Sequence, residues 1–189
     1  MIRIGILGNI GSGKSYVAKN FGYPVFNADY EVSKLYKKDK KIFKKLKKKL
    51  PKYISSFPIN KNEITKAILS NKANLKKIIT IVHLEIRKIL KLFLKKNRNK
   101  KVIILDIPLL LENKINNKDD ILVFVDSKKI EIEKRLKKRL NYNRKLINKF
   151  KKIQFSSYYK KRRSNFIIKN NFKKKSLNKS IKKILNEIL

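Results

Sequence analysis

The chain has 189 residues, a length that suits one compact α/β unit with a sizeable core and a small subdomain. It has no cysteine and one histidine, His83, which excludes disulfides, thiolate metal sites and histidine-cluster metal sites. Its formal net charge of +39 is extreme and is typical of proteins with a polyanionic partner such as nucleic acid.

The basic residues nevertheless argue against a dedicated nucleic-acid site. Only eight of the 52 are arginine, on which such sites usually depend, and the lysines are spread over every predicted helix. Lysine, asparagine and isoleucine also share A/T-rich codons, so the composition of the genome explains the charge without a partner. We expect no specific nucleic-acid partner, only nonspecific binding at low salt.

The apolar runs are too short for a membrane span. The longest, such as IPLLL and ILVFV, have the size of strands, whereas a spanning helix needs roughly 18 residues. The first residues also lack the basic flank, long apolar stretch and cleavage site of a targeting segment. We therefore expect a cytoplasmic protein without a membrane partner, as a monomer or weak oligomer.

The predicted elements alternate between strands and helices along the chain. Residues 2–7 form a strand, 8–13 a glycine loop, and 14–20 the start of a helix. Further along, the patterns predict a short strand over 24–29, a lysine-coated amphipathic helix over 37–52, a long helix over 74–96, strands over 102–105 and 121–126, a basic and mostly helical stretch over 128–163, a weak strand over 166–168 and a terminal helix over 176–189. This alternation, with continuously apolar strands, predicts an α/β fold with a doubly wound parallel sheet flanked by helices.

The sequence GNIGSGKS, residues 8–15, holds three of the chain's five glycines and fits the phosphate-binding pattern G-x-x-x-x-G-K-S. Glycines let the backbone curl so that successive N–H groups point at one anion. Lys14 would reach the β- and γ-phosphates, and Ser15 would ligate Mg²⁺. An ordinary tight turn does not explain the Lys-Ser pair, so we expect a site for ATP and Mg²⁺. The loop residues expected to bind ATP are Gly8, Gly11, Ser12, Gly13, Lys14 and Ser15.

Acidic residues are scarce, with 13 in total, so those that end strands are informative. Ligands of open parallel sheets bind beyond the carboxyl ends of the strands, where we expect Asp29 and Asp106. Asp106 is either the acid that holds Mg²⁺ or a cap of the turn before Pro108. Asp29 is the candidate general base for an attacking hydroxyl, or the N-cap of the next helix, and can be both.

Several motifs resemble the dephospho-coenzyme A kinase family, from residue 2 to about residue 171. ILGNIGSGKS resembles that family's LTGGIGSGKS, and DIPLLLE, residues 106–112, resembles its Pro-Leu-Leu-x-Glu block. VFNADYEVSKL resembles the block that carries Asp29, and VHLEI the block that carries His83. VFVDSKKIEIEKRLKKR resembles the strand and lid helix with paired arginines, and the stretches around Gln154 and Asn170 resemble the closing blocks.

The resemblance implies ATP-dependent phosphorylation of the ribose 3′-hydroxyl of dephospho-coenzyme A, the last step of coenzyme A synthesis. Asp29 would be the base, while Lys14 and Mg²⁺ would spread the charge of the moving phosphoryl group. Ser15 and Asp106 are the implied metal ligands. Further residues implied to bind ATP are Tyr16, through its backbone, Arg135, Arg139 and Asn170, and those implied to bind the acceptor are Asp29, His83, Asp106 and Glu112.

The resemblance also implies one domain with three parts. These are a nucleotide core over about 1–36, 100–127 and 164–189, a helical substrate part over about 37–99 and a lid over about 128–163. The positions that depart from the family's usual residues are Tyr16, Asn27, which replaces one of two acids, Leu84, Asn165, which stands where an acid is common, and Phe172, which stands where glycine is usual.

The residues also admit other interpretations. Arg135 and Arg139, four apart on one predicted helix face, either reach ATP phosphates or pair with Glu131. His83 either contacts the acceptor or packs at the edge of an apolar stripe, and Glu112 either contacts the acceptor or positions it. For the whole chain, the alternatives are another small-molecule kinase, for a nucleoside or nucleoside monophosphate, and a basic nucleic-acid-binding NTPase.

Overall fold

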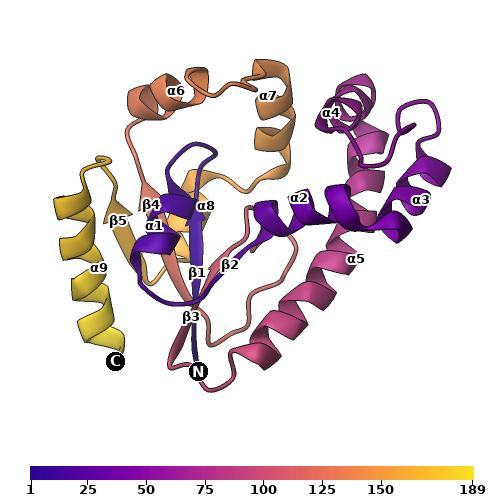
Figure 1. Cartoon of the computed structure of the whole chain (residues 1–189). Coiled ribbons are helices and arrows are strands. Elements are labelled where there is room, and N and C mark those ends of the chain that lie inside the picture. Colours follow the sequence, from indigo (N-terminus) through magenta and orange to yellow (C-terminus); the bar gives the residue numbers. More distant parts are fainter. The chain divides into compact units, whose positions relative to one another are not determined.

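The computed structural model describes residues 1–189, and one parallel sheet of five strands lies within it (Figure 1). The strands are β1 (Ile2–Gly8), β2 (Val25–Asn27), β3 (Val102–Asp106), β4 (Ile121–Asp126) and β5 (Phe166–Lys169). Every neighbouring pair is parallel, in the order β2-β3-β1-β4-β5. The predicted doubly wound sheet is confirmed, and β1, which leads into the glycine loop, is its central strand.

The chain divides into two compact units. Residues 1–27, 97–143 and 150–189 form the sheet unit, and residues 28–96 and 144–149 form the helical unit. The helices are α1 (Lys14–Asn20), α2 (Ala28–Lys38), α3 (Lys40–Lys49), α4 (Lys61–Ser70), α5 (Lys72–Lys96), α6 (Lys129–Lys137), α7 (Arg144–Ile153), α8 (Ser157–Arg162) and α9 (Lys174–Ile188). Helices α2 to α5 and the first part of α7 belong to the helical unit, and the others belong to the sheet unit.

Apolar side chains cover both faces of the sheet, which is why its strands are continuously hydrophobic. On one face, the strands pack against α1 and α9 in a core of buried residues that comprises Ile4, Ile6, Val17, Ala18, Phe21, Val102, Ile104, Val123, Val125, Ile168, Leu177, Ile181 and Ile184. On the other face, the buried Leu110 lies so close to Gly5 that a Cβ there would be 2.5 Å from Leu110 Cδ2. All five residues of β3, which lies beside β1 in the sheet, are buried.

The helical unit is built around the long helix α5, which confirms the helix predicted over 74–96. Its buried stripe has helical spacing and consists of Leu75, Ile78, Val82, Ile86 and Leu90. Helix α3 adds Ile42 and Leu46, which are almost fully buried although lysines coat the rest of the helix. Lys149 Nζ donates to the carbonyls of Ile68 and Leu69 at 2.7 and 2.9 Å, which ties the middle of α7 to the end of α4.

Two local predictions are wrong, and both concern where an element ends. The strand predicted over 24–29 ends at Asn27, so Asp29 lies in the first turn of α2 and not on a strand end. Helix α6 ends at Lys137, so Arg139 lies beyond it and does not share a helix face with Arg135. No glycine or proline marks either boundary, so the sequence contains no clear signal for where the element ends.

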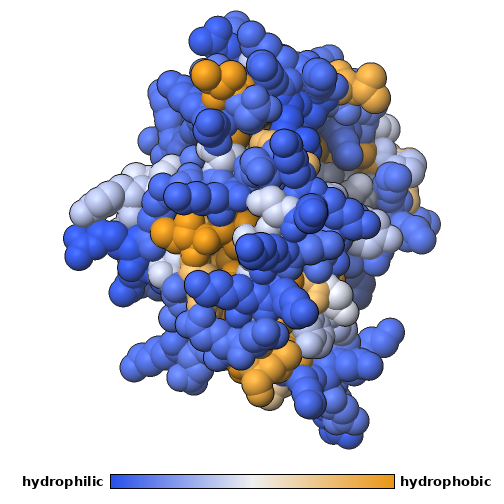
Figure 2. All heavy atoms as spheres, turned by 90° about the vertical axis from the view of Figure 1, so that its left-hand side faces the viewer, coloured by the Kyte–Doolittle hydropathy of each residue, from blue (hydrophilic) through white to orange (hydrophobic).

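The surface is dominated by polar residues. On the face drawn in Figure 2, hydrophilic residues predominate and hydrophobic residues form small, separate groups. No helix combines the length and the apolar composition that crossing a membrane requires. The basic residues occur on every helix of both units and do not gather on one element.

We predict that Asp39→Ala lowers the free energy of unfolding by about 1 kcal/mol. Asp39 is the N-cap of α3, and its side chain accepts hydrogen bonds from the N–H groups of Lys41 and Ile42 at 2.8 and 3.0 Å. Asp39→Ser, which removes the same charge but keeps a capping oxygen, should stay near wild type in urea unfolding. Equal losses in the two variants would contradict the capping role.

Candidate active site

The glycine loop joins β1 to α1 and curls through two left-handed residues. Gly11 has φ +87° and Gly13 has φ +90°, values that favour glycine because a Cβ strains this backbone. A Cβ on Gly13 would also lie 2.6 Å from Asn170 Nδ2. Gly13 caps α1 without any side-chain hydrogen bond, so the first N–H groups of the helix are left for a ligand.

The carbonyl of Ser12 fixes the curl of the loop. It accepts hydrogen bonds from Asn170 Nδ2 and from Ser127 Oγ, both at 2.9 Å. Ser127 follows β4 and Asn170 follows β5, so the ends of two strands hold the middle of the loop. Asn170 is itself buried, and it acts on the loop backbone in this structure.

Lys14 folds back over the loop that precedes it. Its Nζ donates to the carbonyls of Gly8 and Asn9, at 3.1 and 2.8 Å. The ammonium group therefore lies on the side of the loop that the backbone encloses, where it can meet an anion. Ser15 and Tyr16, the next residues, are exposed at the start of α1.

Asp106 ends β3 beside the end of β2. It is paired in register with Asn27, and Asn27 Nδ2 donates to Asp106 Oδ2. Asn27 thus serves as a neutral partner that orients one oxygen of the buried carboxylate. The oxygens of Asp106 and the hydroxyl of Ser15 are of the hard type that Mg²⁺ prefers.

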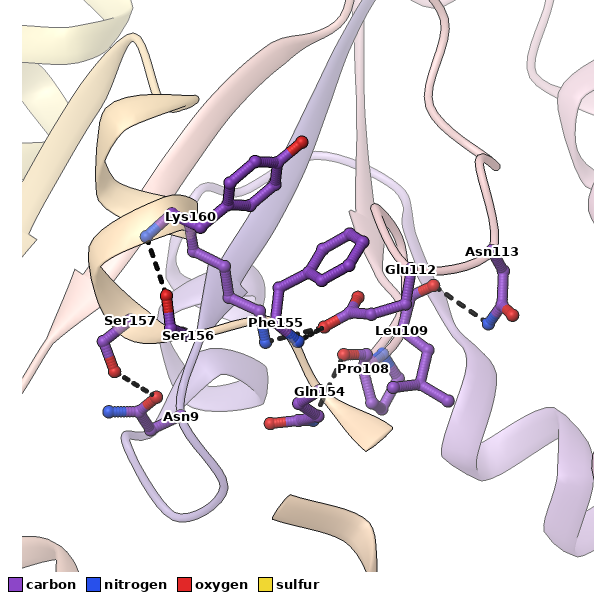
Figure 3. A network of polar contacts seen from close by, with 12 residues as sticks. Asn9, Pro108, Leu109, Glu112, Asn113, Gln154, Phe155, Ser156, Ser157 and Lys160 are labelled. Carbon is purple, nitrogen blue, oxygen red and sulfur yellow. Dashed lines mark hydrogen bonds and ion pairs between the residues drawn. The ribbon is translucent and has the colours of Figure 1, made fainter. Parts of the chain in front are cut away.

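Glu112 ties the segment after β3 to the segment before α8 (Figure 3). Its Oε1 accepts from Lys160 Nζ at 3.0 Å and from the N–H of Phe155 at 2.8 Å, while Oε2 is buried without a partner. Lys160 is only 1% exposed, so the two charges compensate each other inside the protein. The carboxylate of Glu112 therefore holds residues of the chain itself in this structure.

The same segment reaches back to the loop. Gln154 Nε2 donates to the carbonyl of Pro108 at 3.3 Å, and Ser157 Oγ donates to Asn9 Oδ1 at 2.8 Å (Figure 3). The block over 106–112, the segment over 154–160 and the phosphate loop are consequently linked by a continuous polar network within the sheet unit.

The two candidate lid arginines differ in their surroundings. The guanidinium carbon of Arg135 lies 4.2 Å from the centre of the Phe172 ring. Glu131 pairs with Lys134 at 3.9 Å, so the alternative that it pairs with Arg135 is wrong. Arg139 is exposed in the turn after α6.

Two candidate residues belong to the helical unit. Asp29 lies in the first turn of α2, where a carboxylate interacts favourably with the helix dipole. His83 is half-buried on α5, and burial together with the positive charge of Arg87 lowers the pKa of His83 below its usual range. His83 is therefore neutral at physiological pH.

Sequence reasoning missed the residues that support the loop from a distance. Ser127 and Ser157 are ordinary polar residues, and Lys160 is one lysine among many. Their contacts with Ser12, Asn9 and Glu112 arise only when distant segments meet, so no local pattern marks them.

Comparisons with known proteins agree with this geometry. The family model described as dephospho-CoA kinase matches residues 2–176. A dephospho-CoA kinase of Wolbachia pipientis is 33% identical over 98% of this chain and 97% of its own length. The crystal structure of a Thermus thermophilus protein is similar with a TM-score of 0.80 at 27% identity, covering 100% of this chain and 98% of that one. A Campylobacter jejuni dephospho-CoA kinase shares the fold, with a TM-score of 0.59 at 21% identity over 98% and 96% of the two chains.

We predict that Gly13→Ala weakens ATP binding more than about tenfold, because the loop cannot keep its curl. The matched control is Gly22→Ala, since Gly22 also has a positive φ but a Cβ added to it would meet no atom within 4 Å. Gly22→Ala should lower the free energy of unfolding by about 1–2 kcal/mol and leave the affinity for ATP unchanged. Equal effects of the two variants in calorimetric titrations with ATP would contradict the role of the loop.

The lowered pKa of His83 predicts a pH dependence of stability. As the pH falls below about 6.5, the unfolded chain takes up this proton before the folded protein does, so the free energy of unfolding decreases. His83→Gln cannot titrate and should remove the decrease between about pH 7 and 5.5. Because the chain has no other histidine, urea unfolding at a series of pH values isolates this group. An identical pH profile in the variant would refute the assignment.

Proposed function

The chain belongs to the dephospho-CoA kinase family, and we propose that it transfers the γ-phosphoryl group of ATP to the ribose 3′-hydroxyl of dephospho-coenzyme A. The observation that carries the proposal is the phosphate loop over 8–15, held at the end of a parallel sheet with Lys14 folded over it. The family model over nearly the whole chain supports the choice of acceptor.

The loop binds the triphosphate in this proposal. The backbone N–H groups from Gly8 to Tyr16 and the positive end of α1 surround the phosphates, and Lys14 moves from the loop carbonyls to the β- and γ-phosphates. Ser15 and Asp106 would hold Mg²⁺, which would supply positive charge to the phosphate oxygens. Arg135 and Arg139 add positive charge from the lid, and Asn170 holds the loop at Ser12.

Asp29 accepts the proton of the attacking hydroxyl. As the proton passes to the carboxylate, the ribose oxygen forms a bond to the γ-phosphorus. The bond from the γ-phosphorus to the β,γ-bridging oxygen breaks, and ADP leaves with that electron pair. His83 and Asp106 contact the acceptor, and the neutral imidazole of His83 can donate or accept a hydrogen bond. Glu112, which is paired with Lys160, helps to position the acceptor. Catalysis then consists mainly of positioning and charge stabilisation.

We also propose a division of labour along the chain. The parts over about 1–36, 100–127 and 164–189 bind the nucleotide, the helical part over about 37–99 binds the acceptor, and the part over about 128–163 acts as a lid.

The enzyme works in the cytoplasm, where ATP is supplied, as a monomer or weak oligomer.

The proposal is tested by ADP release from purified protein with ATP and Mg²⁺. We expect rapid turnover with dephospho-coenzyme A and little with nucleosides, nucleoside monophosphates or RNA. Activity on a nucleoside or nucleoside monophosphate alone would show that the protein is a kinase with an acceptor other than dephospho-coenzyme A. ATP hydrolysis stimulated only by RNA at physiological salt would favour a nucleic-acid-dependent NTPase instead.

Asp29→Asn should lower kcat by about 10²- to 10⁴-fold and leave ATP affinity unchanged, because the amide cannot accept the proton. The matched control is Asp39→Asn, which also replaces an aspartate of the helical unit by asparagine. Asp39 is the N-cap of α3, and asparagine caps a helix as well as aspartate does. The control variant should turn over at the wild-type rate. Normal turnover by the Asp29 variant would remove this residue as the base.

A further inference from the structure

Phe172 is a half-buried aromatic residue in an unusual backbone conformation, directly beside the phosphate loop. Its φ of 63° lies in the left-handed region, which bulky residues rarely adopt. Its N–H donates to Asn170 Oδ1 at 3.0 Å, so the residue that holds Ser12 also fixes this turn. A strained conformation that the surroundings maintain is characteristic of a functional position.

The ring of Phe172 lies between the loop and helix α6. Its edge touches the loop, because a Cβ on Gly13 would be 3.1 Å from Phe172 Cε1. Its face meets the guanidinium of Arg135, whose carbon lies 4.2 Å from the ring centre. One aromatic ring therefore separates the last glycine of the loop from a positively charged side chain.

Helix α6 is held against the loop at a second point. The buried side chains of Ile132 and Leu136 pack on Gly11, where a Cβ would lie 2.9 Å from Leu136 Cγ and 3.1 Å from Ile132 Cγ2. Leu136 is the neighbour of Arg135 in sequence, so the apolar contact sets the position of the helix. The ring of Phe172 then contacts the arginine side chain itself.

The contact with the ring leaves the hydrogen-bonding capacity of Arg135 unused. Arg135 makes no hydrogen bond or ion pair within the chain. A cation–π contact uses no hydrogen bond, so the five N–H donors of the guanidinium stay available for the oxygens of a phosphate. The arginine is thus kept beside the loop in a form that can bind phosphate.

We propose that Phe172 is a positioning residue that holds Arg135 beside the phosphate loop, ready for the polyphosphate of the nucleotide. This inference rests on the nucleotide role of the loop in the proposed function, but not on the identity of the acceptor. The ring acts by reducing the freedom that a long arginine side chain loses on binding.

The test is a set of calorimetric titrations with ATP and with inorganic tripolyphosphate, which has no base. Phe172→Leu keeps apolar bulk but lacks the ring, and it should weaken the binding of both ligands about two- to fivefold. Phe172→Tyr keeps the ring and should bind both like wild type. Phe172→Met serves as a second ringless variant, and thermal unfolding verifies that each variant is folded.

A double-variant cycle separates positioning from other roles of Phe172. Arg135→Ala should weaken both ligands about tenfold, as expected for a lost charge-assisted contact. Adding Phe172→Leu to Arg135→Ala should then cause no further loss, because the ring acts only through the arginine. A loss of ATP binding that persists without Arg135, or that spares tripolyphosphate, would mean that Phe172 contacts the base and would overturn the proposal.

These binding measurements need no acceptor, so their outcome does not depend on which acceptor the protein phosphorylates. If the protein does not turn over dephospho-coenzyme A but the Phe172 and Arg135 variants bind ATP and tripolyphosphate as expected, the proposed acceptor is wrong and the proposed role of Phe172 stands. Turnover with dephospho-coenzyme A and unchanged binding in Phe172→Leu and Phe172→Met would reject the role of Phe172 alone.

Discussion

The hydrogen bonds to the carbonyl of Ser12 are the constraint on which the rest of the site depends. Asn170 and Ser127 reach this carbonyl from the ends of β5 and β4, so the sheet itself fixes the curl of the loop. With the curl fixed, Gly13 adopts its left-handed conformation and Lys14 lies over the carbonyls that precede it. The loop is therefore shaped for an anion before one arrives, which avoids the cost of ordering it on binding.

The same principle extends outward from the loop. The buried pair of Glu112 and Lys160 orders the segment over 154–160, and Ser157 from that segment bonds to Asn9 of the loop. An ion pair of this kind contributes little net stability, because desolvation offsets its attraction, but removing one partner is costly. The effect of the ion pair here is on geometry, because it joins the segment after β3 to α8. The hydrogen bond from Ser157 to Asn9 then connects both segments to the loop.

Local sequence patterns predicted the parts of the fold that depend on local physics. The continuously apolar strands, the stripe on α5 and the loop follow from burial, helical spacing and glycine chemistry. The end of β2 and the end of α6 were missed, because no glycine or proline marks either boundary. Asn165 shows a different limit: its N–H and Oδ1 bond to the carbonyl and N–H of Leu122, so it orders the start of β4 without the charge of an acid. The burial of Lys160 and the contact of Arg135 with Phe172 depend on tertiary packing, which no local pattern records.

The most direct test of the account is the position of the new phosphate in the product. Phosphorus NMR of the product formed from ATP and dephospho-coenzyme A should show one new phosphomonoester on the ribose 3′-oxygen, with the pyrophosphate bridge of the acceptor intact. That result would establish that the protein transfers a phosphoryl group from ATP to the ribose 3′-hydroxyl of the acceptor. A phosphate on any other oxygen, or ATP hydrolysis without a phosphorylated acceptor, would contradict the central claim.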